Sequence, residues 1–468
     1  MCSVSYVLFD HQKDILALLT EHDRFLLLAE QGTGKSLVTL VHLSNLILAG
    51  EVSTALIIAP LSGLGAWTRD IAKFPKARRA ALNKAIVLRN YDKVSRKGSK
   101  WQRDMWQAWD FIVLDESHAI KKPTANRTQY FIGKGAALGL VSKAKYVYLL
   151  TGTLITNSHL EDAWAPLRAV LGDRWPAWAD FKRYYLVTKN LPGSYAEIIV
   201  GYRNRAELLA ILAQYSYRVL KKDCLDLPKV QDDEIIMVPF AATKNAEPFG
   251  KTTRELYDDA LQSYVEALDM VMDNPLTRML RLRQIAAGHV SESGTIDEAG
   301  RKVKGERYAL KSLKTQYAIE LIEANLPKKT VVAYQFTATC DALERALKAK
   351  GIKYYTLNGA QNDKNIWQKF QQDSTPVFIG QYQSAARAID LFASSYTIFM
   401  EPSDSSEIVE QYRARTDRNG QTESCEYVWL LTEGSIEVDM YAKLLGHEDF
   451  SEKAYREIAI ARVKGETR

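Results

Sequence analysis

The stretch A-E-Q-G-T-G-K-S at Ala29–Ser36 follows the short apolar run Phe25–Leu28 and leads into the largely apolar segment Lys35–Leu48. The run is typical of a buried strand, and the segment is typical of a helix packed under a sheet. Gly32 and Gly34 allow the backbone N–H groups of the loop to curve around phosphate groups, and the helix N-terminus adds a favourable dipole. The stretch therefore predicts an α/β domain that binds phosphates.

Three side chains of this loop have expected roles. Lys35 would reach the β- and γ-phosphates of a nucleotide, and the Ser36 hydroxyl would bind Mg²⁺. Thr33 lies between the two glycines and is expected to bind the nucleotide with them. Ala29 stands where many such loops have their first glycine. The alternative interpretation is a glycine turn that only connects a strand to a helix.

A second group of polar residues, D-E-S-H at Asp115–His118, directly follows the apolar run Phe111–Leu114. Carboxylates at the end of such a strand can face a phosphate loop across the carboxyl edge of a parallel sheet. We expect Asp115 to hold Mg²⁺ and Glu116 to polarise the attacking water during phosphoryl transfer. An acidic pair that only complements a helix dipole is the alternative.

Near the end of the chain, Q-Y-R-A-R-T-D-R-N-G-Q runs from Gln411 to Gln421. Arg415 and Arg418 have a spacing at which both could reach the phosphates from a separate lobe. The alternative is a helix with basic residues on a solvated face.

Short apolar runs recur in two parts of the chain and predict two units with parallel sheets. The expected strands lie at Phe25–Leu28, Ala55–Pro60, Ala85–Leu88, Phe111–Leu114 and Tyr146–Leu150, and then at Val331–Phe336, Lys353–Leu357, Val377–Ile379, Tyr396–Met400 and Tyr427–Leu431.

Helical periodicity in Leu160–Leu220 and Thr252–His289 predicts helical additions to these units, and Ser291–Arg307 has the composition of an exposed loop. We expect a first lobe at 1–235 with a helical extension at about 160–220, a helical insertion and linker at 236–307, and a second lobe at 308–468.

Composition adds few constraints. The chain has 468 residues and a net charge of +6, and no segment has the roughly 20 uninterrupted apolar residues of a membrane span. The four cysteines match no metal-ligand spacing, and the N-terminus lacks a secretory signal, so we expect a cytoplasmic protein. The stretch Arg69–Arg103 holds twelve Lys or Arg and only two Asp, which favours a polyanionic partner.

Ordered segments along the whole chain resemble the Swi/Snf-type ATPases of helicase superfamily two. Besides the three already quoted, they are L-F-D-H-Q at Leu8–Gln12, I-I-A-P-L-S-G-L-G-A-W at Ile57–Trp67, N-Y-D-K-V at Asn90–Val94, L-L-T-G-T-L-I-T-N at Leu149–Asn157, R-V-L-K-K-D at Arg218–Asp223, L-R-Q-I at Leu282–Ile285, Y-Q-F-T-A-T-C-D-A-L-E at Tyr334–Glu344 and L-N-G at Leu357–Gly359. The resemblance implies two RecA-like lobes with helical insertions, in a compact, single-motor form of microbial or viral type, acting in the host cytoplasm if viral.

The resemblance also implies roles for single residues. Gln12 would read the adenine edge, and Gln411 would bind the nucleotide. The residues that would couple the ATP site to movement and DNA are His118, Thr151, Thr153 and Gln421. Arg415 and Arg418 match arginine fingers. DNA contacts are expected at Ser62, Tyr91, Lys121, Lys122, Gln335, Gly359 and Gln381.

One segment departs from the family pattern. At Gln381–Leu391 the chain reads Q-Y-Q-S-A-A-R-A-I-D-L, with alanines in place of glycines and Asp390 near an expected Asn. Alanine restricts the loop conformations that glycine permits, so the second lobe is expected to grip the phosphate backbone differently.

The function implied is an ATP- and Mg²⁺-dependent motor that moves along mainly double-stranded DNA without sequence preference. It would be monomeric and could take its target from a protein partner. Two alternatives remain open: a nucleotide-gated DNA-binding module with weak hydrolysis, and an RNA-dependent ATPase.

Overall fold

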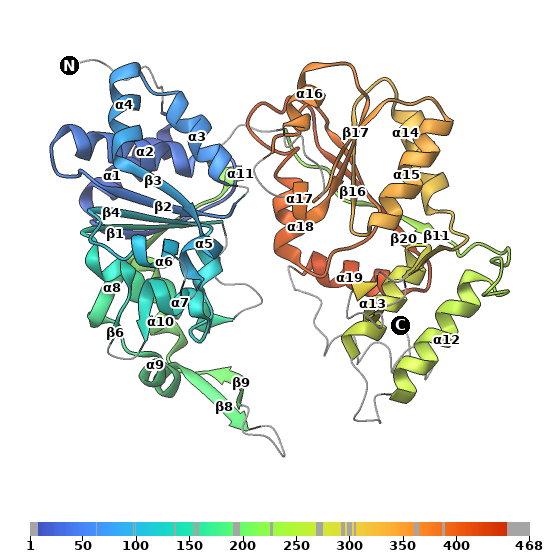
Figure 1. Cartoon of the computed structure of the whole chain (residues 1–468), viewed down its shortest axis with the longest axis horizontal. Coiled ribbons are helices and arrows are strands. Elements are labelled where there is room, and N and C mark those ends of the chain that lie inside the picture. Colours follow the sequence, from blue (N-terminus) through green and yellow to red (C-terminus); the bar gives the residue numbers. More distant parts are fainter. Residues whose placement is uncertain are drawn as a thin grey trace. The chain divides into compact units, whose positions relative to one another are not determined.

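The chain forms two compact units, Met1–Asp226 and Leu227–Arg468, which are described separately (Figure 1). The computed structural model describes residues 8–61, 63–96, 98, 100–134, 137–152, 154, 159–190, 197–224, 228–267, 275–291, 295–296, 302–303, 306–359, 365–385 and 389–446.

Unit 1 is built on a six-stranded sheet in which every neighbouring pair is parallel. In spatial order its strands are β10 (Ser216–Val219), β1 (Arg24–Ala29), β7 (Tyr146–Thr151), β4 (Phe111–Asp115), β2 (Ala55–Ala59) and β3 (Ile86–Asn90). The central strands are buried on both faces, which is why their sequences are almost uninterruptedly apolar.

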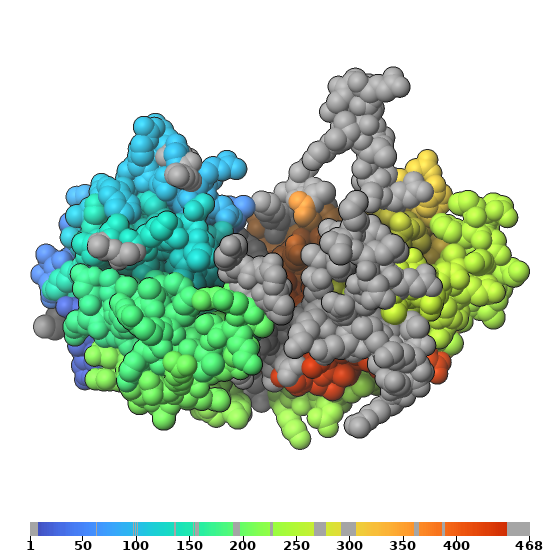
Figure 2. All heavy atoms as spheres, turned by 90° about the horizontal axis from the view of Figure 1, so that it is seen from below, coloured from blue at the N-terminus to red at the C-terminus, as the bar shows by residue number. Residues whose placement is uncertain are grey.

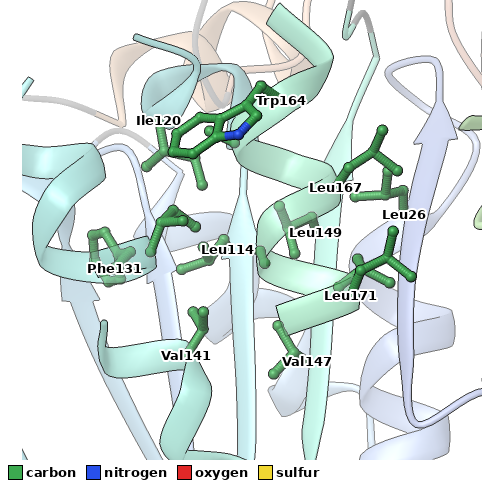
Figure 3. Close-up of a cluster of buried hydrophobic side chains, with 14 of the residues drawn as sticks. Leu26, Leu114, Ile120, Phe131, Val141, Val147, Leu149, Trp164, Leu167 and Leu171 are labelled. Carbon is green, nitrogen blue, oxygen red and sulfur yellow. The ribbon is translucent and has the colours of Figure 1, made fainter. Parts of the chain in front are cut away.

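Helices cover both faces of this sheet (Figure 1). One face packs against α1 (Asp10–Glu21), α2 (Lys35–Leu48), α3 (Leu64–Ala72) and α4 (Lys76–Ala85). The other packs against α7 (Asn126–Ile132), α8 (Trp164–Leu171), α9 (Trp178–Tyr185) and α10 (Arg205–Gln214). Figure 3 shows this second cluster, where Leu114 and Leu149 of the sheet meet Leu167 of α8. Alternate strand residues thus serve opposite cores.

Short elements complete unit 1. They are α5 (Tyr91–Ser95), α6 (Lys100–Asp104), α11 (Lys221–Cys224), the 3₁₀ turns η1 (Ser117–Ile120), η2 (Leu140–Lys143), η3 (Leu160–Ala163) and η4 (Gly172–Arg174), the pair β5 (Gly133–Lys134) and β6 (Ala137–Leu138), and the antiparallel pair β8 (Leu186–Asn190) and β9 (Glu197–Tyr202).

The expected helical extension at about 160–220 is therefore only partly helical. It contains α8, α9 and α10, but β8 and β9 form a ribbon that projects from unit 1, and β10 joins the main sheet (Figure 1). The physical reason is local composition, because E-I-I-V-G-Y at Glu197–Tyr202 is rich in β-branched residues that favour a strand. Residues of this extension form a broad green face of unit 1 in Figure 2.

Unit 2 has a second six-stranded parallel sheet. In spatial order its strands are β11 (Glu234–Val238), β20 (Glu426–Thr432), β19 (Tyr396–Phe399), β16 (Thr330–Tyr334), β18 (Val377–Gln381) and β17 (Tyr354–Leu357). One face packs against α14 (Lys314–Asn325) and α15 (Thr337–Ala349), and the other packs against α16 (Ile366–Gln372), α17 (Tyr382–Ala385), α18 (Ser406–Arg413) and α19 (Ile436–Leu445).

The helical insertion consists of α12 (Thr253–Ala267) and α13 (Pro275–Ala286), which share an apolar cluster with α19. The expected exposed loop at Ser291–Arg307 instead includes short antiparallel pairs, β12 (His289–Ser291) with β15 (Arg307–Ala309) and β13 (Thr295–Ile296) with β14 (Lys302–Val303).

The units divide at 226/227, ahead of the first boundary expected at 235. Strand β11 belongs to the second sheet, because its five residues pair with β20. A separate division at 307/308 stays a proposal.

The predicted fold class is confirmed: the chain has two parallel sheets flanked by helices, with helical additions. In the described part of the chain no helix is long and apolar enough to cross a membrane. Because the strands of each sheet are parallel, the loops after their last residues gather at one edge, which we call the carboxyl edge of that sheet.

Candidate functional site

We call the six-stranded sheets of units 1 and 2 sheet 1 and sheet 2. The glycine loop lies at the carboxyl edge of sheet 1, between β1 and α2. Gly32 and Gly34 have φ angles of 88° and 87°, in the left-handed region that favours glycine. The Lys35 ammonium donates to the backbone oxygens of Ala29 at 2.5 Å and Glu30 at 3.3 Å. Within the described residues no carboxylate is in ion-pair contact with Lys35. Its hydrogen bonds to Ala29 and Glu30 go to backbone carbonyls, an arrangement that suits exchange for an anion.

Helix α1 packs directly against this loop. Gln12 Nε2 donates to the Thr33 oxygen at 3.1 Å, and His11 Nε2 lies 2.9 Å from the same oxygen. A Cβ atom at Gly34 would stand 2.3 Å from Gln12 Nε2 and would displace this side chain, and the φ of 87° independently favours glycine there. The structure thus brings the predicted adenine reader next to the predicted phosphate loop.

A cavity of about 660 Å³ opens in unit 1 beside the start of α1. Phe9 and His11 line one side with stacked rings, and Tyr217 and Arg218 of β10 line another. Sequence patterns gave no sign of it, because β10 reaches α1 only through the tertiary fold.

Asp115 and Glu116 end strand β4 at the same edge. Asp115 Oδ2 accepts a hydrogen bond of 2.8 Å from the indole N–H of Trp67, and Asp115 Oδ1 accepts one of 3.0 Å from the backbone N–H of Glu116. Burial and the neighbouring charge of Glu116 raise the pKa of Asp115 to about 6, while the Trp67 bond and the charge of Lys35 oppose that rise. A cation at this carboxylate would relieve the repulsion.

Glu116 has a strained backbone. Its φ of 49° is one of two positive values among the described non-glycine residues. Such strain concentrates at functional sites. The conformation brings Glu116 Oε2 to 3.4 Å from His118 Nδ1, which also lies 3.4 Å from Thr151 Oγ1 at the end of β7. Three predicted residues from two strand ends therefore meet. The fourth, Thr153, lies outside the described residues.

The predicted DNA contacts of unit 1 have different surroundings. Tyr91 is buried, and its hydroxyl donates to the backbone oxygen of Asp115 at 2.8 Å, so it supports the end of β4. Lys121 forms an ion pair with Asp162 at 3.0 Å, whereas Lys122 is exposed. Ser62 lies outside the described residues.

In unit 2 the three predicted DNA contacts share the carboxyl edge of sheet 2. Gln335 follows β16, Gln381 ends β18 and Gly359 follows β17, and these strands are neighbours. Gln381 Nε2 donates to the backbone oxygen of Gln335 at 3.4 Å. Beneath them, the buried Glu401 carboxylate accepts from the Gln335 backbone N–H at 3.0 Å and from the Thr339 hydroxyl.

The arginine segment, Gln411–Gln421, begins in the last turn of α18 and continues beyond the end of this helix. Arg415 is buried; its Nε donates to the Gln411 oxygen at 3.0 Å, and its Nη1 donates to the Ile389 oxygen at 3.4 Å. Arg418 forms an ion pair with Asp390. Gln421 is buried and donates to three backbone oxygens around this loop, so its observed role is to hold the loop in shape.

Residues that the sequence did not single out also matter. Asp233, in the segment that enters unit 2, is buried and accepts from Arg413 of α18, from Trp429 Nε1 at 2.8 Å and from the Tyr441 hydroxyl at 2.9 Å. Asp233 stands in an ordinary polar run, so no sequence signal marks it. Trp67 is the second such residue. Only its place in the segment Ile57–Trp67, which resembles the family, could have drawn attention to it.

The basic stretch Arg69–Arg103 is spread over several elements of unit 1, from α3 to α6. Part of its charge is already met locally: Lys73 pairs with Asp70 at 2.6 Å, and Arg78 donates to Asn45 at 2.9 Å. Lys76 and Lys84 of α4 are exposed.

Two parallel sheets, with a glycine loop and paired carboxylates at the edge of the first, define an α/β protein of the phosphate-binding class. A family model described as the SNF2-related domain matches residues 11–289, and one described as the helicase conserved C-terminal domain matches residues 313–420. The chain belongs to the SNF2-related family.

Two curated relatives illustrate the similarity. The DNA excision repair protein ERCC-6-like of Danio rerio is 23% identical over 521 residues, covering 93% of this chain and 35% of that protein. The human DNA annealing helicase and endonuclease ZRANB3 is 24% identical over 462 residues, covering 93% of this chain and 39% of that protein. This chain thus spans well under half the length of either relative.

Among solved structures, the Sulfolobus solfataricus SWI2/SNF2 ATPase core in complex with dsDNA is similar, with a TM-score of 0.41 and 21% identity, covering 97% of this chain and 93% of that one.

Proposed function

We propose that the chain is an ATP-dependent DNA translocase that couples hydrolysis of the β–γ phosphate bond to movement along double-stranded DNA. One observation carries this proposal: the Lys35 ammonium is held by loop carbonyls and interacts with the partly buried carboxylate of Asp115. A cation that can exchange its partners and a carboxylate that favours a metal are the two parts that bind a nucleoside triphosphate with Mg²⁺.

The nucleotide would be bound by unit 1. Lys35 and the N–H groups of the glycine loop would hold the phosphates, with Thr33 between the two glycines. The adenine would lie near Gln12, and the adjoining cavity of about 660 Å³ has room for the nucleoside and an aromatic ring at Phe9.

The residues present fit Mg²⁺, because Asp115 offers a partly buried carboxylate and Ser36 offers a hydroxyl on the first turn of α2. When bound, Mg²⁺ neutralises charge on the phosphate oxygens. Glu116 would orient and polarise the attacking water, and its strained backbone keeps the carboxylate near His118. The contact of His118 with Thr151 would pass the state of the nucleotide to the neighbouring strand end.

Unit 2 would supply Arg415 and Arg418 to the transferring phosphoryl group, with Gln411 beside them. Arginines supplied in this way accelerate phosphoryl transfer by roughly 10³ to 10⁵ in related NTPases. Gln421 would act indirectly, through the shape of the arginine loop.

DNA would be held through its phosphates. Lys122 in unit 1 and the shared edge of Gln335, Gly359 and Gln381 in unit 2 are the contacts that the geometry supports best. Lys121 would have to exchange Asp162 for a phosphate. Contacts of this kind give little sequence preference and an affinity that falls steeply with salt. We further propose a monomeric motor that takes its target from a protein partner.

Steady-state ATP hydrolysis tests the proposal, measured without nucleic acid and with duplex DNA, single-stranded DNA or RNA. Duplex DNA should give the strongest stimulation, and Lys35→Ala should abolish it. Lys350→Ala, which removes an exposed lysine paired with Glu323, is the matched control and should keep full activity. Stimulation by RNA alone would assign the chain to RNA. Nucleotide-dependent DNA binding without hydrolysis would identify a switch rather than a motor.

A further inference from the structure

The end of the segment that departs from the family pattern, residues 389–391, lies against the loop that carries Arg415 and Arg418. The Ile389 backbone oxygen accepts from Arg415 Nη1 at 3.4 Å and from Arg418 Nη1 at 3.3 Å. In return, the Leu391 backbone N–H donates to the Arg415 oxygen at 2.8 Å. Both candidate fingers therefore converge on one short stretch of backbone.

Asp390, between these residues, provides the only carboxylate that contacts Arg418 within the described residues. Its Oδ1 accepts from Arg418 Nη1. Its backbone oxygen accepts from Gln371 Nε2 of α16, and Gln371 Oε1 accepts from the Ala393 N–H at 3.0 Å. The backbone of Asp390 is thus hydrogen-bonded to a helix that packs on the sheet. This bond restricts where the Asp390 carboxylate can lie.

The contacts of Arg418 use one end of its guanidinium. Ile389 and Asp390 both accept from Nη1. Within the described residues, Nε and Nη2 contact no acceptor, and 23% of the side chain is exposed. A guanidinium presents parallel donors that match two phosphate oxygens, and the edge formed by Nε and Nη2 is the one left available here.

We propose that Asp390 is a positioning residue for hydrolysis: it holds Arg418 by Nη1 and so keeps the opposite edge of the guanidinium available to bind the transferring phosphate. The inference rests on the proposed function. It also gives the end of the altered segment Gln381–Leu391 a role, because Asp390, near the expected Asn, supplies a charge that orients a candidate finger.

An arginine side chain loses considerable rotamer freedom when it binds a phosphate. When a partner already fixes the guanidinium in the folded protein, part of this loss of rotamer freedom occurs on folding rather than in the catalytic step. Asp390 and Arg418 are both partly exposed, so solvent screens their attraction and the expected effect is moderate. It should fall on the catalytic step, since the Asp390 carboxylate acts through Arg418 in this proposal.

Duplex-stimulated ATP hydrolysis by the full chain tests this proposal with Asp390→Ala, Asp390→Asn and Arg418→Ala. Asp390→Ala should lower kcat about five- to tenfold with KM for ATP within twofold. Asp390→Asn keeps an oxygen acceptor and should recover part of the loss. Adding Asp390→Ala to Arg418→Ala should cause no further loss, because both changes remove the same interaction.

The matched control is Asp341→Ala, which breaks the partly exposed ion pair with Arg307 elsewhere in unit 2 and should leave kcat unchanged. Thermal unfolding of each variant shows whether the folded fraction accounts for any loss. A higher kcat in Asp390→Ala would overturn the proposal and make the pair a latch that withholds Arg418. Additive losses with Arg418→Ala, or a loss explained by unfolding alone, would also overturn it.

Failure of the proposed function has a different signature. In that case the wild-type chain itself would hydrolyse ATP no faster than Lys35→Ala. Normal hydrolysis by the wild type together with unchanged kinetics in both Asp390 variants would instead reject only the positioning role.

Discussion

The indole N–H of Trp67 donates a 2.8 Å hydrogen bond to Oδ2 of Asp115. Trp67 is fully buried on α3, whereas Asp115 is the last residue of β4, so the bond ties a helix on one face of sheet 1 to the carboxylate at its edge. Because Asp115 Oδ1 accepts from the Glu116 N–H, both oxygens have fixed directions. A metal at this carboxylate would therefore meet an acceptor that is already oriented.

Replacing Trp67 by Phe should weaken hydrolysis through Asp115. The pKa of Asp115 is raised to about 6 even though the Trp67 bond lowers it. Loss of the bond therefore raises this pKa further. The ionised carboxylate then becomes scarcer near neutral pH. We expect kcat/KM to fall about tenfold at pH 7, as for the loss of a hydrogen bond to a charged group. The acid limb of the pH profile should move to higher pH.

Trp106→Phe is the matched control, since the Trp106 ring packs on Tyr130 and Lys143 and is 40% exposed. Its pH profile should equal that of the wild type. A uniform loss in Trp67→Phe at every pH would contradict the link to Asp115.

Glu401 gives unit 2 a pH dependence of stability. Burial raises the pKa of this carboxyl from 4.5 to about 7, and Lys314 and the Thr339 bond only partly offset that rise. Between these two values the folded chain holds a proton that the unfolded chain lacks. Stability is therefore lost as pH rises through this window, by about 3 kcal/mol in total.

Hydrogen exchange of β16 and β19 amides, measured from pH 5 to pH 8, reports this opening free energy for unit 2. The difference between wild type and Glu401→Gln should shrink and then reverse toward high pH, because the glutamine does not titrate. A difference that stays constant across the range would show that Glu401 does not titrate there.

Lys314 and Glu437 form an ion pair at 2.5 Å in which each side chain is only 2% exposed. The Lys314 ammonium also donates to the Met400 oxygen at 2.8 Å, and Glu437 Oε2 also accepts from the Thr432 N–H at 2.8 Å. Lys314→Met leaves a buried charge without its partner, so we expect a loss of about 3–5 kcal/mol in the free energy of unfolding.

Urea unfolding of unit 2 measures this loss. The double variant Lys314→Met with Glu437→Gln should lose much less than the sum of the single variants, since neither charge of this pair then remains without its partner. Lys350→Met, which breaks an exposed pair with Glu323, should change stability by under about 1 kcal/mol. Additive single effects would show that the two charges do not depend on each other.

The place of β11 predicts which fragment of the chain folds. Its five residues pair with β20, although the long segment carrying α12 and α13 separates them in sequence. A fragment of residues 228–468 should be folded and monodisperse. A fragment of residues 308–468 leaves the β20 edge unpaired and uncovers Ile436 and Met440, so it should aggregate. Size-exclusion chromatography and circular dichroism distinguish the two results.

Central strands could be predicted from the sequence because burial on both faces makes them uniformly apolar, as in Ala55–Ala59. Two of the four edge strands, β10 and β11, were not predicted, whereas β3 and β17 were. Strand β10 reads S-Y-R-V, in which polar residues interrupt the apolar ones, and β11 exposes Ile235 and Met237 at the edge of its sheet. The β8–β9 ribbon lies within a segment whose periodicity is typical of a helix.

For the candidate site, chain order was enough where a residue directly follows an apolar strand. Lys35 begins the helix after β1, while Asp115 and Thr151 end β4 and β7, and these three strands share one carboxyl edge, so their gathering follows from the fold class. The supporting residues could not be predicted in this way. Trp67 and Asp233 act through partners far away in the sequence, and Tyr91 proved to be buried beneath the site.

The attachment at Asp233 has a mechanical consequence. The backbone entering unit 2 is first attached at Gln231, whose N–H donates to the Cys425 oxygen just before β20, and then at Asp233, which is bonded to Arg413. Arg413 ends the helix that leads to Arg415 and Arg418, the candidate arginine fingers. A force along this connection would therefore act on the start of β20 and on the end of α18, next to the candidate fingers.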